Sequence, residues 1–234
     1  MAVTGLQRLV WITAQLRKYC PWTQQLTHHQ LTEYLIEEAY EAVEVIESIP
    51  ASQWNDVAAS NATYEEFRKE LGDVLFQVTL HSAIAEQAGA FTIDDVADAI
   101  SQKMLRRNPH VFDEDGQLRP ADQLGNVTID EVEKNWEQIK QTEKGDQTPA
   151  EDAARSSIFD LPPGLPALAA AAKIIDRANR QPVDPFGDTP RTTSATIDLT
   201  ADNVGGQLFE LVRIARAQGI DLEAELRQYN SRLR

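Results

Sequence analysis

Apolar residues recur at helical spacing along almost the whole of this chain, and this pattern limits the fold more than any other feature. In the segment LTEYLIEEAYEAVEVIES, apolar side chains recur every three or four residues, which is the spacing of one face of an α-helix. These residues are Leu31, Leu35, Ala39, Ala42, Val43 and Ile46. Strand-type alternation is almost absent, so we predict an all-α protein.

Helix-start signals support this prediction. A threonine followed three residues later by an acidic residue or glutamine is typical of a capping box at a helix N-terminus. Such pairs are Thr27 with Gln30, Thr63 with Glu66, Thr92 with Asp95 and Thr128 with Glu131. The predicted helices cover residues 4–18, 28–48, 63–88, 93–107, 128–143, 165–179, 201–217 and 221–233.

The segment GDQTPAED, which begins at residue 145, is rich in residues that break helices and marks a boundary between domains. We predict a catalytic helical domain over residues 1–145, a linker over 146–160 and a second helical unit over 161–234.

The second unit resembles part of the first. ELGDVLF at residues 70–76 aligns with NVGGQLF at residues 203–209, which indicates that one helical unit occurs twice. The aligned positions replace Glu70 by Asn203 and Asp73 by Gly206, so we expect a degenerate copy that lacks the acidic residues. A chance match between two apolar helices is the alternative.

The charge and the cysteine content limit the partners and the compartment. With 37 acidic and 22 basic residues the net charge is −15, which argues against a nucleic acid polymer or an anionic membrane as partner. The single cysteine, Cys20, excludes an intramolecular disulfide framework and fits a reducing compartment. No stretch approaches 18 uncharged apolar residues, and the N-terminus lacks the apolar core of a signal peptide. We therefore expect a soluble cytoplasmic protein.

Three glutamates, Glu37, Glu38 and Glu41, interrupt the apolar pattern of the second predicted helix. Glu38 and Glu41 share a helix face because residues three apart are neighbours on a helix surface. The third predicted helix carries Glu70 and Asp73 at the same spacing, at the edge of its own apolar stripe. Antiparallel pairing of these helices would bring four carboxylates into one cluster.

Such a cluster requires a cation, because two like charges about 6 Å apart repel by roughly 3 kcal/mol at an effective dielectric constant near 20. Ligation by carboxylate oxygens alone suits Mg²⁺ or Mn²⁺. Cys20 and four scattered histidines do not supply a zinc site. A di-iron carboxylate site is excluded because no histidine has a glutamate three residues before it. The alternative that stays open is an acidic helix face exposed to solvent.

Four segments in order resemble the MazG-type nucleoside triphosphate pyrophosphohydrolases. They are CPWTQQLTH (20–28), EEAYE (37–41), ELGDVLFQV (70–78) and KMLRRNPHVF (103–112), and WEQIK (136–140) and LPALAAAAKI (165–174) continue the match. The resemblance implies a helical bundle completed by dimerisation, with Mg²⁺ on the EExxE and ExxD carboxylates. It also implies hydrolysis of a nucleoside triphosphate to the monophosphate and pyrophosphate, with broad tolerance of the base.

Carried over by position, the resemblance assigns the metal ligands to Glu38, Glu41, Glu70 and Asp73. Glu37 would then bind a second metal ion or orient the attacking water. The metal would be Mg²⁺, with Mn²⁺ as a substitute.

The substrate-binding residues are expected at both ends of the matched region. Lys103, Arg106 and Arg107 would grip the phosphates and stabilise the leaving pyrophosphate. The structural alternative is a basic last turn that complements the helix dipole. Trp22 would stack on the base, or else fill the core, and His110 would contact the substrate or pack a loop.

Two positions depart from the family pattern. Thr23 stands where the family has an aspartate after CPW, and Asn108 stands where it has a histidine before PHVF. Any metal-binding or proton-transfer role of those side chains is therefore in doubt.

The sequence thus predicts a homodimeric, Mg²⁺-dependent enzyme that hydrolyses nucleoside triphosphates, including non-canonical and deoxy forms, and cleans the nucleotide pool. A helical regulatory protein that binds a nucleotide or alarmone without turnover is the alternative from a different class.

Overall fold

The computed structural model describes residues 4–56, 60–125, 127–143, 158–180 and 203–231. Within these ranges the regular secondary structure is helical, and the one β-bridge is an isolated pair between Phe112 and Leu118. This confirms the all-α prediction. The chain divides into two compact units, Met1–Met104 and Leu105–Arg234, which we describe separately. The predicted boundary near residue 145 falls outside the described residues and stays a prediction.

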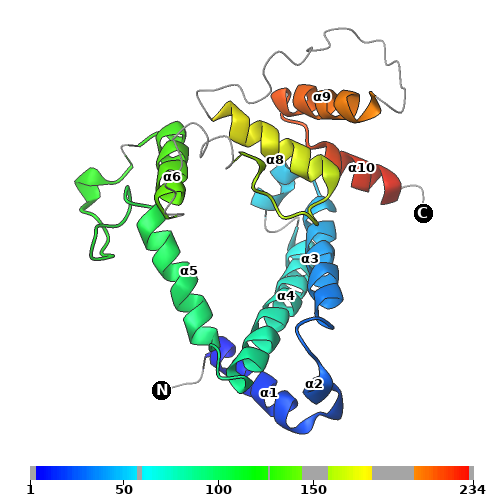
Figure 1. Cartoon of the computed structure of the whole chain (residues 1–234), viewed down its shortest axis with the longest axis vertical. Coiled ribbons are helices and arrows are strands. Elements are labelled where there is room, and N and C mark those ends of the chain that lie inside the picture. Colours follow the sequence, from blue (N-terminus) through cyan, green and yellow to red (C-terminus); the bar gives the residue numbers. More distant parts are fainter. Residues whose placement is uncertain (1–3, 57–59, 126, 144–157, 181–202, 232–234) are drawn as a thin grey trace. The chain divides into compact units, whose positions relative to one another are not determined.

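The first unit is built on a long helical hairpin. Its elements are α1 (Gly5–Tyr19), α2 (Pro21–Gln25), α3 (Thr32–Glu47), the 3-10 helix η1 (Ala51–Asn55), α4 (Asn61–Gln87) and most of α5 (Ile93–Arg107). Helices α3 and α4 run side by side in opposite directions, and α1 packs against the distal half of α4 (Figure 1). The sequence did not predict α2 or η1.

The capping predictions have mixed outcomes. At α5, Thr92 and Asp95 form the predicted box, in which the Asp95 carboxylate accepts from the Thr92 amide at 2.7 Å. Thr128 and Glu131 do the same at the start of α6 (Ile129–Glu143). The box of Thr27 also forms, but its turn precedes α3.

The box predicted at Thr63 is wrong. The Ser60 carbonyl accepts the first helical hydrogen bond of α4, from the Tyr64 amide at 2.9 Å. Thr63 therefore already lies inside the first turn, where its side chain cannot cap the helix.

A buried arginine anchors the corner between α1 and α2. The Arg17 guanidinium donates to the backbone carbonyls of Thr23 and Leu26 and to the Gln87 side chain of α4. Nearby, the Thr13 and Thr79 hydroxyls lie 3.2 Å apart in a hydrogen bond between α1 and α4. The adjoining apolar cluster contains Leu26, Leu31 and Leu80, with Tyr34, Phe76 and Ile84 packed against it. These contacts fix the start of α3 on α4.

The predicted apolar stripes of the hairpin are only partly buried. Leu31, directly before α3, and Ala42 on α3 are buried, whereas Leu35 and Ile46 are exposed. A single chain therefore buries only part of this stripe. The exposed large apolar side chains of the hairpin are Leu35, Ile36, Tyr40, Ile46, Leu71 and Leu75.

The second unit holds η2 (Ala121–Gln123), α6, α8 (Ala167–Asn179), α9 (Val204–Ala217) and α10 (Leu222–Ser231). Helix α8 packs against α9 and α10. The buried apolar residues of the second unit are Ile158, Ile175, Ala178, Val212 and Ala215. Between α8 and α9, the Asp176 carboxylate pairs with the Arg216 guanidinium at 2.5 Å.

Candidate active site

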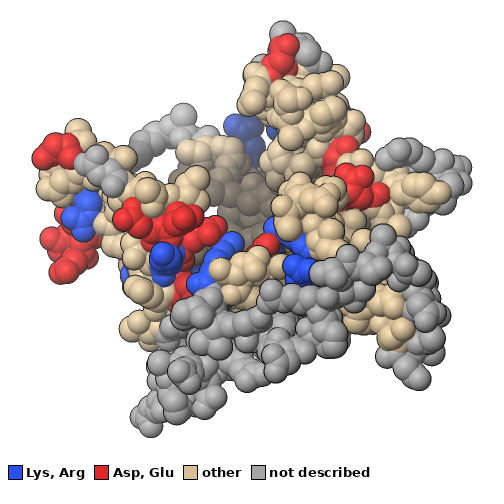
Figure 2. Space-filling view, turned by 90° about the horizontal axis from the view of Figure 1, so that it is seen from above, with Lys and Arg blue, Asp and Glu red and all other residues tan. Residues whose placement is uncertain are grey.

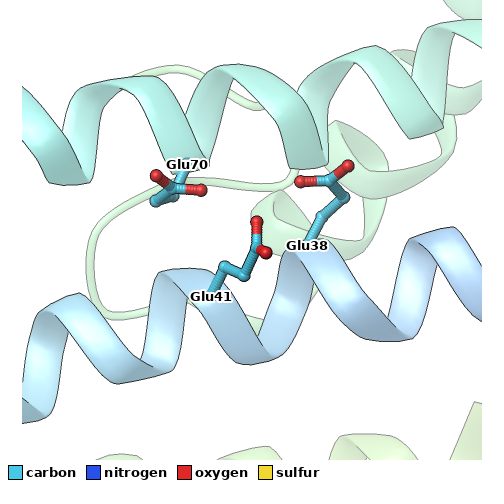
Figure 3. Close-up of side chains that lie close together, drawn as sticks. All are labelled: Glu38, Glu41 and Glu70. Carbon is cyan, nitrogen blue, oxygen red and sulfur yellow. The ribbon is translucent and has the colours of Figure 1, made fainter.

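Three carboxylates from the hairpin point toward one another. Glu38 and Glu41 project from α3 and Glu70 projects from α4 into the space between the two helices (Figure 3). One carboxylate oxygen from each residue lies within 4.8 Å of the others. The cluster arises from the antiparallel pairing, because residues three apart on α3 face a single position on α4.

The electrostatics of the cluster favour a cation. The pKa of Glu38 is raised, first by partial burial and then by repulsion from Asp73 and Glu41. Partial burial also raises the pKa of Glu70, followed by repulsion from Glu41 and Asp73. A raised pKa means that the folded protein disfavours the charged carboxylates, and a bound cation would reverse that preference.

Asp73 and Glu37 lie at the edge of this cluster. Both side chains are exposed, and neither belongs to the group of three. Both charges nevertheless raise the pKa of Glu38, and Asp73 is the largest electrostatic contributor there. The structure thus brings together three of the four predicted metal ligands and places the fourth within their electrostatic reach.

The chemistry of the donor set fits a hard divalent cation. All the converging atoms are carboxylate oxygens, which Mg²⁺ and Mn²⁺ prefer. Two of the four histidines are not scattered, contrary to expectation, since Nδ1 of His28 lies 2.8 Å from Nδ1 of His81. This pair does not belong to a group of three metal-binding residues among the described parts of the chain.

The predicted phosphate-binding arginines, Arg106 and Arg107, end α5 in the second unit. Both pair with the Glu143 carboxylate, at 3.0 and 2.5 Å respectively. The Arg107 guanidinium also lies 5.5 Å from the centre of the Trp136 ring, which is a cation–π distance. Lys103 is half-buried and lies one turn before Arg107 on the same helix.

The remaining predicted substrate contacts differ in exposure. Trp22 is 57% exposed and touches Tyr34 edge-on with ring centres 6.4 Å apart. Its ring therefore does not fill the core of the first unit. His110 is half-buried, and its Nδ1 atom is buried without a hydrogen-bond partner among the described residues.

Both departures from the family pattern have structural roles. Thr23 is buried, and its hydroxyl donates to the Leu16 carbonyl at 2.6 Å, so this side chain closes the corner between α1 and α2. Asn108 accepts a hydrogen bond from the indole N–H of Trp136 at 3.2 Å. Each contact therefore stabilises the local backbone of its own unit.

Sequence reasoning missed two residues that contact the predicted arginines. Trp136 lies in the WEQIK segment, and an aromatic residue in a matched motif was a signal that could have marked it. Glu143 lies 36 residues after Arg107, and the sequence around it has no pattern that indicates this contact.

The fold and the cluster define a helical protein with a candidate site for a divalent cation. The family model for the MazG nucleotide pyrophosphohydrolase domain matches residues 26–112, which contain all the clustered carboxylates.

Relatives match almost the whole chain. The nucleoside triphosphate pyrophosphohydrolase/pyrophosphatase MazG of Thermotoga maritima is 33% identical over 235 residues, covering 95% of this chain and 80% of the relative. The nucleoside triphosphate pyrophosphohydrolase of Escherichia coli K12 is 30% identical, covering 97% and 83%. An uncharacterised protein of Streptomyces cacaoi is 34% identical, covering 94% and 75%.

The chain therefore belongs to the MazG nucleotide pyrophosphohydrolase family. This membership confirms the predicted class of enzyme, a hydrolase of phosphoric anhydrides in nucleoside triphosphates.

On the face shown in Figure 2, the described lysine and arginine side chains lie in small groups among acidic ones, and they form no broad basic patch there. None of the described helices is long and apolar enough to cross a membrane.

Proposed function

We propose that this chain hydrolyses nucleoside and deoxynucleoside triphosphates, including non-canonical ones, to the monophosphate and pyrophosphate in a Mg²⁺-dependent reaction. The observation that carries the proposal is the convergence of Glu38, Glu41 and Glu70 within the segment that the family model matches. Removal of aberrant nucleotides from the cellular pool is the proposed role.

The acidic cluster explains why a cation is needed for this substrate. A triphosphate is a polyanion, and three carboxylates alone would repel it. Glu38, Glu41, Glu70 and Asp73 would hold the cation, which supplies charge neutralisation and positions the phosphate oxygens when it is bound. Glu37, which is exposed and directly precedes Glu38, would orient the attacking water and accept its proton.

Cationic and aromatic side chains would complete the recognition of the substrate. Lys103, Arg106 and Arg107 would bind phosphate oxygens and stabilise the charge that develops on pyrophosphate as the phosphoanhydride bond breaks. The exposed ring of Trp22 would stack on the base, and stacking tolerates different bases because each presents a π-face. His110 would contact the substrate through its ring nitrogen.

A second copy of the chain would complete the bundle. The hairpin of α3 and α4 exposes six large apolar side chains, of which Ile36 is 53% and Leu71 is 48% exposed. An apolar surface of this kind is typical of a protein interface, and a symmetric dimer would pair the same surface on both chains. We therefore propose a homodimer.

The test is pyrophosphate release by the purified full chain with each nucleoside and deoxynucleoside triphosphate, and with analogues that carry deaminated or oxidised bases. Release is expected with Mg²⁺ or Mn²⁺ and not with a chelator. Glu41→Gln is expected to abolish release, whereas Glu44→Gln removes the same charge from an exposed position on α3 outside the cluster and should leave it intact. Tight nucleotide binding without release in any condition would instead support the regulatory alternative.

A further inference from the structure

One carboxylate occupies both arginines at the end of α5. The Oε1 atom of Glu143 accepts from Nε and Nη2 of Arg106 at 3.2 and 3.0 Å. The Oε2 atom accepts from Nε and Nη2 of Arg107 at 3.2 and 2.5 Å. Each guanidinium therefore presents the same edge, and the two edges converge on a single anion. Charge-assisted hydrogen bonds between a guanidinium and a carboxylate are stronger than bonds between neutral groups.

The surroundings hold this arrangement in place. The side chain of Arg107 is 12% exposed and that of Glu143 is 25% exposed. The Trp136 ring lies against the Arg107 guanidinium and limits its rotation. The pKa of Glu143 is lowered, first by the hydrogen bond from Arg107 and then by the bond from Arg106, so its carboxylate stays charged at neutral pH.

We infer that Glu143 is an internal competitor for phosphate, which occupies the arginine pair until an oxyanion of the substrate or product displaces it. The edges that bind Glu143 are the edges that arginine offers to phosphate oxygens, so both anions cannot use them at once. The inference rests on the proposed function for the role of the arginines as a phosphate site, but it does not require turnover.

The competition has two consequences. The apparent affinity for a phosphate ligand is reduced by the fraction of molecules in which the arginine pair is free. The return of Glu143 to the arginines also accelerates the release of pyrophosphate, because the guanidinium charges are satisfied again when the product leaves. Glu143 thus exchanges some substrate affinity for faster release of the product.

The test is a calorimetric titration of the full chain with inorganic pyrophosphate in Mg²⁺ buffer. Glu143→Gln frees the arginines and is expected to tighten pyrophosphate binding about tenfold. The matched control is Glu133→Gln, which removes the same charge from α6 but breaks a pair with Arg180 instead. The control is expected to change the affinity less than twofold. Equal affinities of the two variants, or weaker binding by Glu143→Gln, would overturn the inference.

Two further variants keep the test decisive. Adding Arg107→Gln to Glu143→Gln should remove the gain, because the gain depends on the freed guanidinium. Glu143→Asp keeps the charge but shortens the side chain, so it should tighten pyrophosphate binding by less than Glu143→Gln. This variant provides the test if Glu143→Gln does not fold. No tightening in either Glu143 variant refutes the competition.

The pyrophosphate titration and the test of the proposed function can fail independently of each other. A chain that releases pyrophosphate from no triphosphate would refute the enzymatic proposal, while the pyrophosphate titration would still decide the role of Glu143. Conversely, an active enzyme whose Glu143→Gln variant binds pyrophosphate like the control would refute only the competition.

Discussion

Replacing Glu41 by glutamine is expected to stabilise the metal-free protein and to weaken its stabilisation by Mg²⁺. Glu41 is the informative position because its charge raises the pKa of both Glu38 and Glu70. Glutamine keeps the shape of the side chain and removes the charge. The substitution therefore reports the repulsion inside the cluster with little change in packing.

The magnitude follows from the separation of the carboxylates. With ligand oxygens within 4.8 Å of one another, two charges repel by about 3 kcal/mol at an effective dielectric constant of 20 and by about 1 kcal/mol in water. Glu41 is exposed, so solvent screening places the expected gain near the lower value, about 1 kcal/mol. A gain of that size raises the melting temperature by a few degrees.

The assay is thermal or urea unfolding in a chelator and again in saturating Mg²⁺. Wild type should gain stability with Mg²⁺, by about 2.7 kcal/mol at a concentration 100 times the dissociation constant, whereas Glu41→Gln should gain much less. The stability order of the two proteins should therefore reverse when Mg²⁺ is added. Glu44→Gln, which removes an exposed charge from the same helix, should show no reversal.

Two results would refute the reasoning. Destabilisation of the metal-free protein by Glu41→Gln would mean that the carboxylate has a structural partner. Equal stabilisation of wild type and Glu41→Gln by Mg²⁺ would mean that the cluster does not bind the metal and is a solvated acidic face.

Three further predictions concern pH, assembly and the corner of α1. The pKa values of Glu38 and Glu70 lie above their usual 4.5, so these two carboxylates hold more protons in the folded metal-free protein than in the unfolded chain. The lowered pKa values of Asp95, Glu131 and Glu143 act in the opposite direction, so the measurement is a difference between two proteins. In urea titrations with chelator, wild type should lose stability relative to Glu38→Gln as pH rises from about 4.5 through the raised values; a difference that stays constant with pH would contradict the prediction. Leu71→Asp should convert the proposed dimer to a monomer in sedimentation experiments, whereas Ile129→Asp, at an apolar position 79% exposed on α6, should not; a dimer that survives Leu71→Asp would place the interface elsewhere. Arg17→Met should cost about 2–4 kcal/mol in urea unfolding, because two backbone carbonyls lose their buried donor; a loss below 1 kcal/mol would contradict the anchoring role.

The elements that the sequence predicted well are those determined by local interactions. Helix α5 begins and ends where the spacing of apolar residues and the capping box place it, at Ile93 and Arg107. The approach of Glu70 to Glu41 was also predictable, because the face of each carboxylate follows from the helical period and antiparallel pairing of the two helices brings those faces together.

The elements that the sequence did not predict depend on contacts between distant segments. The five-residue helix α2 has no amphipathic period to detect, and its position depends on the Arg17 guanidinium of another helix. The pairing of Glu143 with Arg106 and Arg107 joins residues 36 and 37 positions apart, and its geometry requires the tertiary arrangement of α5 and α6. A single glutamate at a helix end carries no local pattern from which such a contact could be inferred.

Two pairs of packed helices in this chain differ in the charges that they bring together. In the second unit, α8 and α9 bring Asp176 against Arg216, so their charges are neutralised within the protein. In the first unit, α3 and α4 bring carboxylate against carboxylate, and the pKa of Glu70 is raised, first by partial burial and then by repulsion from Glu41 and Asp73. The charges of the α8–α9 pair are matched within the protein, whereas a cation from solution would be needed to match those of the α3–α4 pair. We propose that the clustered acids reduce the stability of the free hairpin and are accounted for by the cation that they would bind, which is the relation expected of a functional site rather than of a structural one.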